Sequence, residues 1–170
     1  MADEAVPVDL VVRFSEALHG VGGRAARCPS RRAALEEVRR LVGDGPAVVD
    51  RHDDLAGLAG ILPLTDDPWA ADAGVTGAVA AVADTGSLAL VCDPARPRST
   101  SLVPPRHIAL VPVDRLVPGY PDAVELLAAQ RPLPSAMYFV TGPSRTGDIE
   151  LTLVRGVHGP GQVDVVLFDA

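Results

Sequence analysis

The chain has 170 residues, 48% of them hydrophobic, and a formal net charge of −7. This length predicts a single domain over residues 1–170, and the acidic charge excludes non-specific binding to nucleic acid, which requires a positive surface. The sequence contains no run of 18 uncharged apolar residues and no signal-peptide pattern at its start, so we expect a cytoplasmic protein without a membrane span.

The first 50 residues predict a regular alternation of helices and strands. Apolar side chains recur with helical spacing in two stretches, and Ser30 and Gly43 are suitable caps for the second one. We expect a short strand after each stretch. The expected elements are a helix over 7–19, a strand over 24–28, a helix over 31–42 and a strand over 47–50. This order is typical of an α/β fold with a mostly parallel open sheet flanked by helices.

The middle of the chain predicts a β-hairpin near 75–92. Two apolar runs, 75–83 and 87–92, flank the turn sequence Asp84-Thr85-Gly86. Small residues dominate the first run, so we expect another segment to pack closely against it. Trp69, the only tryptophan, is expected to be a packing residue.

The last third predicts further strands around one more helix. The expected elements are a loop over 93–105, a buried strand over 107–111, a helix over 121–130, a buried strand over 136–140 and a closing central strand over 163–168. Residues 147–155 are ambiguous. Apolar side chains at alternate positions fit a strand, whereas Thr146 as a cap and Asp148 at a positive helix end favour a helix, which is our preferred interpretation.

The turn after the strand over 136–140 carries residues suited to a ligand. Gly142 ends the strand, and Arg145 offers a forked donor to a carboxylate or phosphate. The free N–H groups of a following helix would face the same ligand. An ordinary turn, with Arg145 paired to Asp148 or Glu150 on the surface, explains the same residues equally well.

Three short motifs follow one another in the second half of the chain. They are Ala83-Asp-Thr-Gly-Ser-Leu88, Leu102-Val-Pro-Pro-Arg-His-Ile108, and Thr141-Gly-Pro-Ser-Arg-Thr-Gly-Asp-Ile-Glu150 followed by Gly156-Val-His-Gly-Pro160. Together they resemble the motifs of the lactate utilization protein C family, the LUD domain family. The resemblance is close over 70–170 and loose before it. Gly147 stands where the family usually has alanine, and the N-terminus looks shorter than that of a typical member.

This resemblance implies a fold, a role and a site. The fold is the NagB/RpiA/CoA transferase-like one, shared with ribose-phosphate isomerases, CoA transferases and formyltetrahydrofolate cyclo-ligases. The role is the oxidation of L-lactate to pyruvate, alongside two iron–sulfur partner proteins. The ligand-binding residues expected from the motifs are Thr85, Gly86, Ser87, Gly142, Ser144, Arg145, Thr146 and His158. By pattern alone, an ordinary hairpin turn in which Asp84 and Thr85 satisfy the local backbone is favoured at the first motif.

The residues also limit the chemistry of the chain. Its two cysteines, Cys28 and Cys92, cannot supply the four thiolates of an iron–sulfur cluster. All 15 basic residues are arginine, so no lysine is present to form a Schiff base. Zinc-ligand spacing and an obvious flavin motif are lacking too. We therefore expect neither a cofactor nor a metal.

Two functional hypotheses remain open, and the residues do not decide whether the chain is an enzyme. In the first, the chain is a non-redox component of a lactate-oxidising system that binds a small carboxylate or another anion, or assembles with the iron–sulfur proteins. In the second, it is a stand-alone enzyme of the isomerase, CoA-transferase or cyclo-ligase type, with Glu150 or Asp148 as base or nucleophile. A homodimer is a reasonable expectation without direct support from particular residues.

Overall fold

The computed structural model describes residues 8–147, 153–155 and 159–169. A five-stranded sheet forms the centre of the fold, and each pair of neighbouring strands in it is parallel. In spatial order its strands are β1 (Arg24–Cys28), β11 (Gln162–Phe168), β6 (Arg106–Pro112), β3 (Ala73–Thr76) and β2 (Ala47–Val49). This sheet confirms the predicted α/β class and the interior position of the closing strand.

Different elements cover the two faces of this sheet. The alternation along β11 shows the difference, because Val165 and Leu167 pack in a core with helix α1 (Val8–Gly20), whereas Val166 and Phe168 pack in a core with helix α2 (Arg31–Val42). Both helices match their predicted ranges within one residue. The side chain of Ser30 accepts a hydrogen bond from the N–H of Ala33, as expected of an N-cap.

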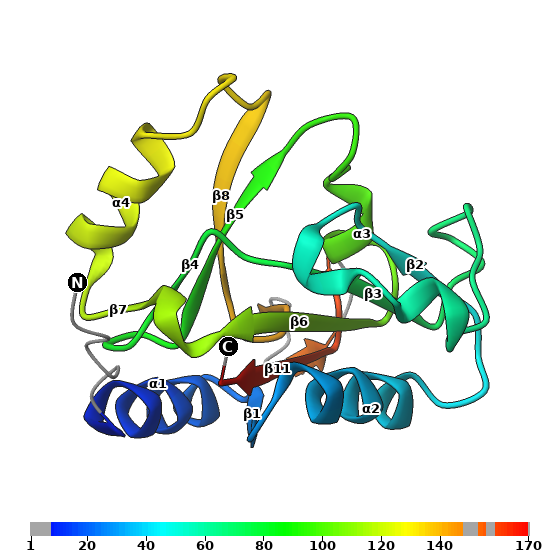
Figure 1. Ribbon diagram of the computed structural model, residues 1–170, viewed down its shortest axis with the longest axis horizontal. Helices are drawn as coiled ribbons and strands as arrows, with labels where there is room; N and C mark the ends of the chain where they lie inside the picture. Colours follow the sequence, from blue (N-terminus) through cyan, green and yellow to red (C-terminus); the bar gives the residue numbers. More distant parts are fainter. Residues whose placement is uncertain (1–7, 148–152, 156–158, 170) are drawn as a thin grey trace.

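A second, four-stranded sheet packs against the α1 side of the first and was not predicted. In spatial order it contains β7 (Leu116–Val117), β4 (Ala80–Val82), β5 (Ser87–Cys92) and β8 (Ala136–Thr141). Helix α4 (Tyr120–Ala128) lies over the opposite face of this sheet, where Ala123 and Leu127 join its apolar core. Figure 1 shows α4 and the upper end of β8 rising away from the central sheet.

Short helical turns complete the described chain. They are the 3-10 turns η1 (Asp53–Leu55), η2 (Leu58–Gly60) and η3 (Val113–Arg115), and the one-turn helix α3 (Ser99–Leu102), which lies within the predicted loop over 93–105. α3 packs against β3, because the carbonyl oxygen of Thr100 sits directly over Gly74. Among the residues that the structure describes, no helix has the length and apolar character needed to cross a membrane.

The predicted hairpin is confirmed in part. Strands β4 and β5 pair in antiparallel fashion around the turn at residues 83–86. The run over 75–83 is not one strand, however, because β3 ends at Thr76 and the chain crosses at Gly77 into the other sheet. A Cβ atom on Gly77 would lie 2.7 Å from the His52 ring, so the crossing depends on a residue without a side chain.

Three other predictions were wrong. A helix over 147–155 does not form in the described part, because β9 (Arg145–Gly147) pairs with β10 (Leu153–Arg155), as the alternating apolar residues had allowed. Trp69 is not a packing residue, since it is 83% exposed in the loop before β3. The strand over 136–140 is only half-buried, because β8 is an edge strand.

Candidate functional site

Two of the predicted ligand-binding turns lie side by side. Strand β5 pairs with β8 so that Ser87 stands opposite Thr141. The hydroxyl oxygen of Ser87 lies 2.8 Å from that of Thr85, 2.7 Å from that of Thr141 and 2.9 Å from that of Tyr120. We call these four residues the hydroxyl cluster. Ser87 is fully buried at its centre, so the cluster joins both turns to the start of α4.

The two glycines of these turns have a structural role. Gly86 and Gly142 have φ angles of 66° and 69°, in the left-handed region that favours glycine. A Cβ atom would lie 2.3 Å from the backbone nitrogen of Leu18 at Gly86, and 2.8 Å from the carbonyl oxygen of Val21 at Gly142. Both turns therefore rest directly on the C-terminal end of α1.

The remaining predicted site residues are less closely gathered. The N–H of Ser144 donates to the carbonyl oxygen of Pro160 at 2.9 Å, which ties this turn to the start of the last segment. Arg145 and Thr146 belong to strand β9, so the expected helix N-terminus is not present at this turn. Asp148, Glu150 and His158 lie outside the described residues. The binding and catalytic roles of all these residues stay predictions.

The hydroxyl cluster changes the acidity of Tyr120. Hydrogen bonds from Ser87 and then Thr141 stabilise the phenolate, and they lower the pKa of Tyr120 below its ordinary value. Burial acts in the opposite sense on Tyr138, the other tyrosine, and raises its pKa.

We therefore expect a Ser87→Ala variant to raise the pKa of Tyr120 towards the ordinary value of about 10 and to leave Tyr138 unchanged. Ultraviolet titration of phenolate absorbance would show two separate transitions in the wild type that move closer together in the variant. Tyr120→Phe assigns the lower transition, and an unmoved transition in Ser87→Ala would show that Ser87 does not set this acidity.

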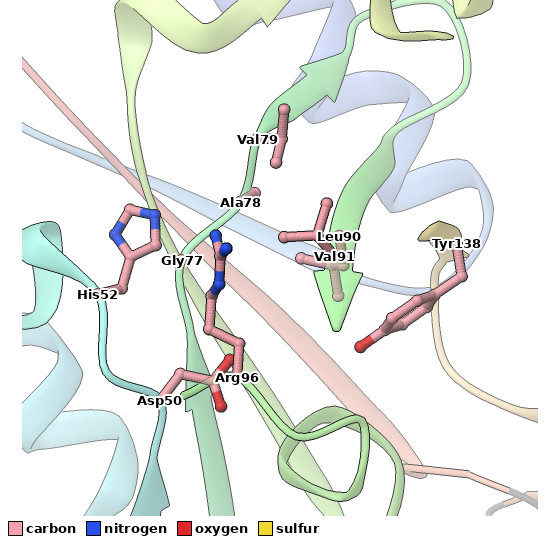
Figure 2. A pocket seen from close by; sticks show the side chains of 9 residues that line it. All are labelled: Asp50, His52, Gly77, Ala78, Val79, Leu90, Val91, Arg96 and Tyr138. Carbon is pink, nitrogen blue, oxygen red and sulfur yellow. The ribbon is translucent and has the colours of Figure 1, made fainter. Parts of the chain in front are cut away.

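A second group of polar residues surrounds a small pocket between the two sheets (Figure 2). Two of its lining residues, Asp50 and Gly77, directly follow β2 and β3. The pocket therefore lies at the carboxyl ends of two neighbouring parallel strands, which is where open α/β sheets usually bind ligands. The lining residues are Asp50, His52, Gly77, Ala78, Val79, Leu90, Val91, Arg96 and Tyr138. The enclosed volume is about 10 Å³, which is room for about one water molecule.

Asp50 is the least satisfied polar residue of this pocket. Its Oδ1 atom is shielded from solvent and has no hydrogen-bond partner within the described part of the chain. Burial raises the pKa of Asp50 to about 7, against the opposing effects of the Thr100 hydroxyl and the Arg96 charge, while the charge of Asp93 adds to the rise. Near neutral pH this side chain is therefore both an acid and a base.

Arg96 and Tyr138 approach the pocket from different elements. The Nε atom of Arg96 donates to Oδ2 of Asp93 at 2.9 Å, so the positive charge beside the cavity is already matched by one carboxylate. The hydroxyl of Tyr138 lies 2.9 Å from that of Ser101, which anchors the phenol from β8 to α3. Figure 2 shows the hydroxyl of Tyr138 directed towards the middle of the pocket, whereas the guanidinium group of Arg96 points towards Gly77 and Ala78, away from the Asp50 carboxylate.

His52 is held in place as a neutral ring. Its Nδ1 atom accepts a hydrogen bond of 3.3 Å from the N–H of Asp54, and Nη1 of Arg115 lies 2.7 Å from the Asp54 carboxylate. Burial is the main cause that lowers the pKa of His52, with the charges of Arg115 and Arg96 acting the same way against Asp54. Arg115 also donates to the carbonyl oxygen of Ala78. His52, Asp54 and Arg115 therefore hold in place the segment around Gly77 where the chain crosses from one sheet to the other.

A further histidine lies in the interior on the same face of the central sheet. His107, fully buried on β6, places Nε2 2.8 Å from the hydroxyl of Thr76, and its Nδ1 has no partner among the described residues. Burial lowers the pKa of His107 to about 4, so the ring stays neutral in the folded protein above that pH.

Sequence reasoning missed the pocket. Arg96 belonged to the predicted loop over 93–105 and was not among the expected site residues, and Asp50 was only the last residue of a predicted strand. The available signal was that Asp50 and Gly77 directly follow two strands of a parallel sheet. Finding the pocket from that signal required knowing that β2 and β3 are neighbours, which the sequence does not state.

Comparisons with known proteins fit the three motifs. Residues 63–168 match the family model of the LUD domain. The lactate utilization protein C of Macrococcus caseolyticus is 36% identical over 103 residues, covering 58% of this chain and 45% of that protein. The lactate utilization protein C of Anoxybacillus flavithermus is 32% identical over 145 residues, covering 76% and 66%. An uncharacterized protein of Neisseria meningitidis, NMB1437, is 41% identical over 90 residues, covering 52% and 39%.

One solved structure shares the fold. The crystal structure of a DUF162 family protein from Deinococcus radiodurans superposes with a TM-score of 0.71 and 21% identity, and the match covers 94% of this chain and 96% of that one. The chain spans 39% to 45% of the length of the first curated relatives that it matches. Because the family model covers most of the sequence, from the loop before β3 to the end of β11, the chain belongs to the LUD domain family.

Proposed function

We propose that the chain is a non-redox component of a lactate utilization system and binds a small carboxylate in the pocket between the two sheets. Its similarity to proteins named lactate utilization protein C supports the system. The observation that carries the ligand is the meeting of Arg96 and Asp50 at one small cavity. A guanidinium group pairs well with a carboxylate, and the apolar walls from Leu90 and Val91 strengthen that attraction by excluding water.

The size of the cavity favours a small acid. About 10 Å³ could take one carboxylate oxygen in the space of a water molecule, while the rest of the ligand would lie outside this cavity. Such a space suits a three-carbon acid far better than a CoA or folate molecule. With two cysteines in the chain, electron transfer would fall to iron–sulfur partner proteins, as the resemblance implies.

The test is a thermal-shift series with L-lactate, pyruvate, phosphosugars, CoA and folates. We expect L-lactate or pyruvate, at about 100 times its dissociation constant, to stabilise the protein by about 2.7 kcal/mol, or roughly 5–10 °C. Arg96→Gln should abolish this shift because it removes the cation. Arg32→Gln should preserve the shift, because Arg32 is an exposed side chain on α2.

Arg145→Ala separates the two possible locations. Loss of the shift in Arg145→Ala but not in Arg96→Gln would place the ligand at the turn over 141–147, as the sequence analysis suggested. Loss in neither variant would remove the proposal of an arginine-held anion. The proposed assembly with iron–sulfur proteins is tested by copurification with the tagged chain from cells grown on lactate. Recovery of proteins that carry bound iron and sulfide would support this assembly, and failure to recover them would count against it.

A stand-alone enzyme is the second candidate, and one observation favours it. Asp50 changes protonation near neutral pH beside a cation, which is the property required of a general acid or base. Turnover of a phosphosugar, an acyl-CoA or a folate by the purified chain, lost in Asp50→Asn, would replace the first proposal with this one. Asp148 and Glu150, the predicted catalytic pair, would be tested in the same assay.

A further inference from the structure

We infer that the pocket binds its carboxylate ligand together with a proton, and that Asp50 carries this proton. The inference rests on the proposed function and concerns the same pocket. It specifies the ionic form of the site that accepts the ligand and the class of acid that it prefers.

The charges around the cavity lead to this conclusion. Arg96 contributes one positive charge, and Asp93 already matches it through a hydrogen bond of 2.9 Å. An ionised Asp50 makes the site net negative before any ligand enters. A carboxylate ligand would then meet an anion across a cavity with room for about one water molecule, where like charges repel strongly. One proton on Asp50 removes this repulsion.

The hydrogen-bonding atoms fit the same state. Oδ1 of Asp50 is shielded from solvent and has no hydrogen-bond partner within the described residues. A protonated carboxyl group is a donor as well as an acceptor, whereas an ionised one can only accept. A protonated Asp50 can therefore donate to the ligand carboxylate.

The environment moves the pKa values of the other groups near Asp50 away from neutral pH. The hydrogen bond from Arg96 is the main cause that keeps the pKa of Asp93 low. Burial lowers the pKa of His52 below its ordinary value and raises that of Tyr138 on β8. Thr100, from α3, carries no charge. Asp50 is thus the group at this pocket whose pKa is moved to about 7.

A preference among ligands follows from the charge count. With Asp50 protonated, the charges of Arg96 and Asp93 cancel, so a monocarboxylate leaves the site with a single net negative charge and should be the preferred class of acid. A dicarboxylate or a phosphate dianion would leave two negative charges unmatched in a poorly hydrated space. L-lactate and pyruvate belong to the accepted class.

The experiment is calorimetric titration of the whole chain with pyruvate and L-lactate at about pH 6 and about pH 8. If only the protonated form binds, the dissociation constant should be about tenfold larger at the higher pH. Repeating the titration in buffers of different ionisation enthalpy should show close to one proton taken up at about pH 8. Asp50→Asn should bind equally at both pH values and about tenfold more tightly than wild type at the higher one.

Matched variants and a second measurement separate the outcomes. Asp44→Asn alters a fully exposed side chain and should keep the wild-type pH dependence. Pyruvate should also raise, by at least about one pH unit, the aspartate ¹³C-carboxyl transition that lies near pH 7 in the wild-type protein. Binding that is independent of pH, or a carboxyl transition that pyruvate leaves unmoved, would overturn the inference alone. Failure of every monocarboxylate to bind at either pH would overturn the proposed function as well.

Discussion

A Gly74→Ala variant is expected to lose about 3 kcal/mol of stability, which corresponds to a fall in melting temperature of roughly 6–12 °C. A Cβ atom on Gly74 would lie 1.7 Å from the carbonyl oxygen of Thr100 and 3.2 Å from the Pro104 ring. The nearer obstacle is backbone, so no side-chain rotation relieves it. Helix α3 would have to move away from β3 and would take Thr100 away from Asp50.

Gly60→Ala is the control for this substitution, because a Cβ atom there would have no neighbour within 4 Å. It should change the melting temperature by no more than a few degrees. Thermal unfolding followed by circular dichroism compares the two variants with the wild type. Equal, small effects of both substitutions would show that α3 does not pack closely on the central sheet.

Asp50→Asn and His107→Gln are expected to change the pH dependence of stability in opposite directions. The pKa of Asp50 rises from 3.8 to about 7 on folding, so the folded state holds more protons between these values and stability falls as pH increases. The pKa of His107 falls from 6.5 to about 4 on folding, so the unfolded state holds more protons and stability falls as pH decreases. In the wild type the two effects oppose each other.

Removing either group should expose the effect of the other. In Asp50→Asn, acidification from about pH 7 to about pH 4.5 should destabilise the protein by about 2.4 kcal/mol, because the buried ring of His107 resists protonation. In His107→Gln, the same acidification should stabilise it by about 2 kcal/mol, a value reduced for the partial exposure of Asp50. Urea unfolding at several pH values measures both slopes. Parallel slopes in the wild type and the two variants would show that neither group has the acidity that its environment indicates.

The elements that the sequence predicted well are those whose signals are local. The apolar faces of α1 and α2, the Ser30 cap and the short apolar run of β2 are each visible within about a dozen residues. The second sheet was missed because its signals are not local. Strand β7 has two residues and β4 has three, and β5 pairs with β8, which follows it in the sequence only after α3, β6 and α4.

The candidate site divides in the same way. Thr85, Ser87 and Gly142 came from continuous motifs, and the pairing of β5 with β8 does bring them together. Asp50 and Arg96 come from separate loops that meet only because the second sheet folds over the first. Thr146 suggested a helix because hydroxyl side chains cap helices, but the same residue type is common in strands, and here it pairs with Val154.

The exposed position of Trp69 also has an optical consequence. The residue is 83% exposed shortly before β3 begins, and the N–H of Asp72 ties the end of its loop to Pro46, just before β2. It therefore stands near the amino ends of the parallel strands, whereas the pocket lies beyond their carboxyl ends. Its indole already meets water in the native state, so its fluorescence responds little to unfolding or to a small acid in the pocket. A protein that covered this end of the sheet would change the fluorescence of Trp69. The chain therefore has an intrinsic signal for protein docking that is separate from ligand binding.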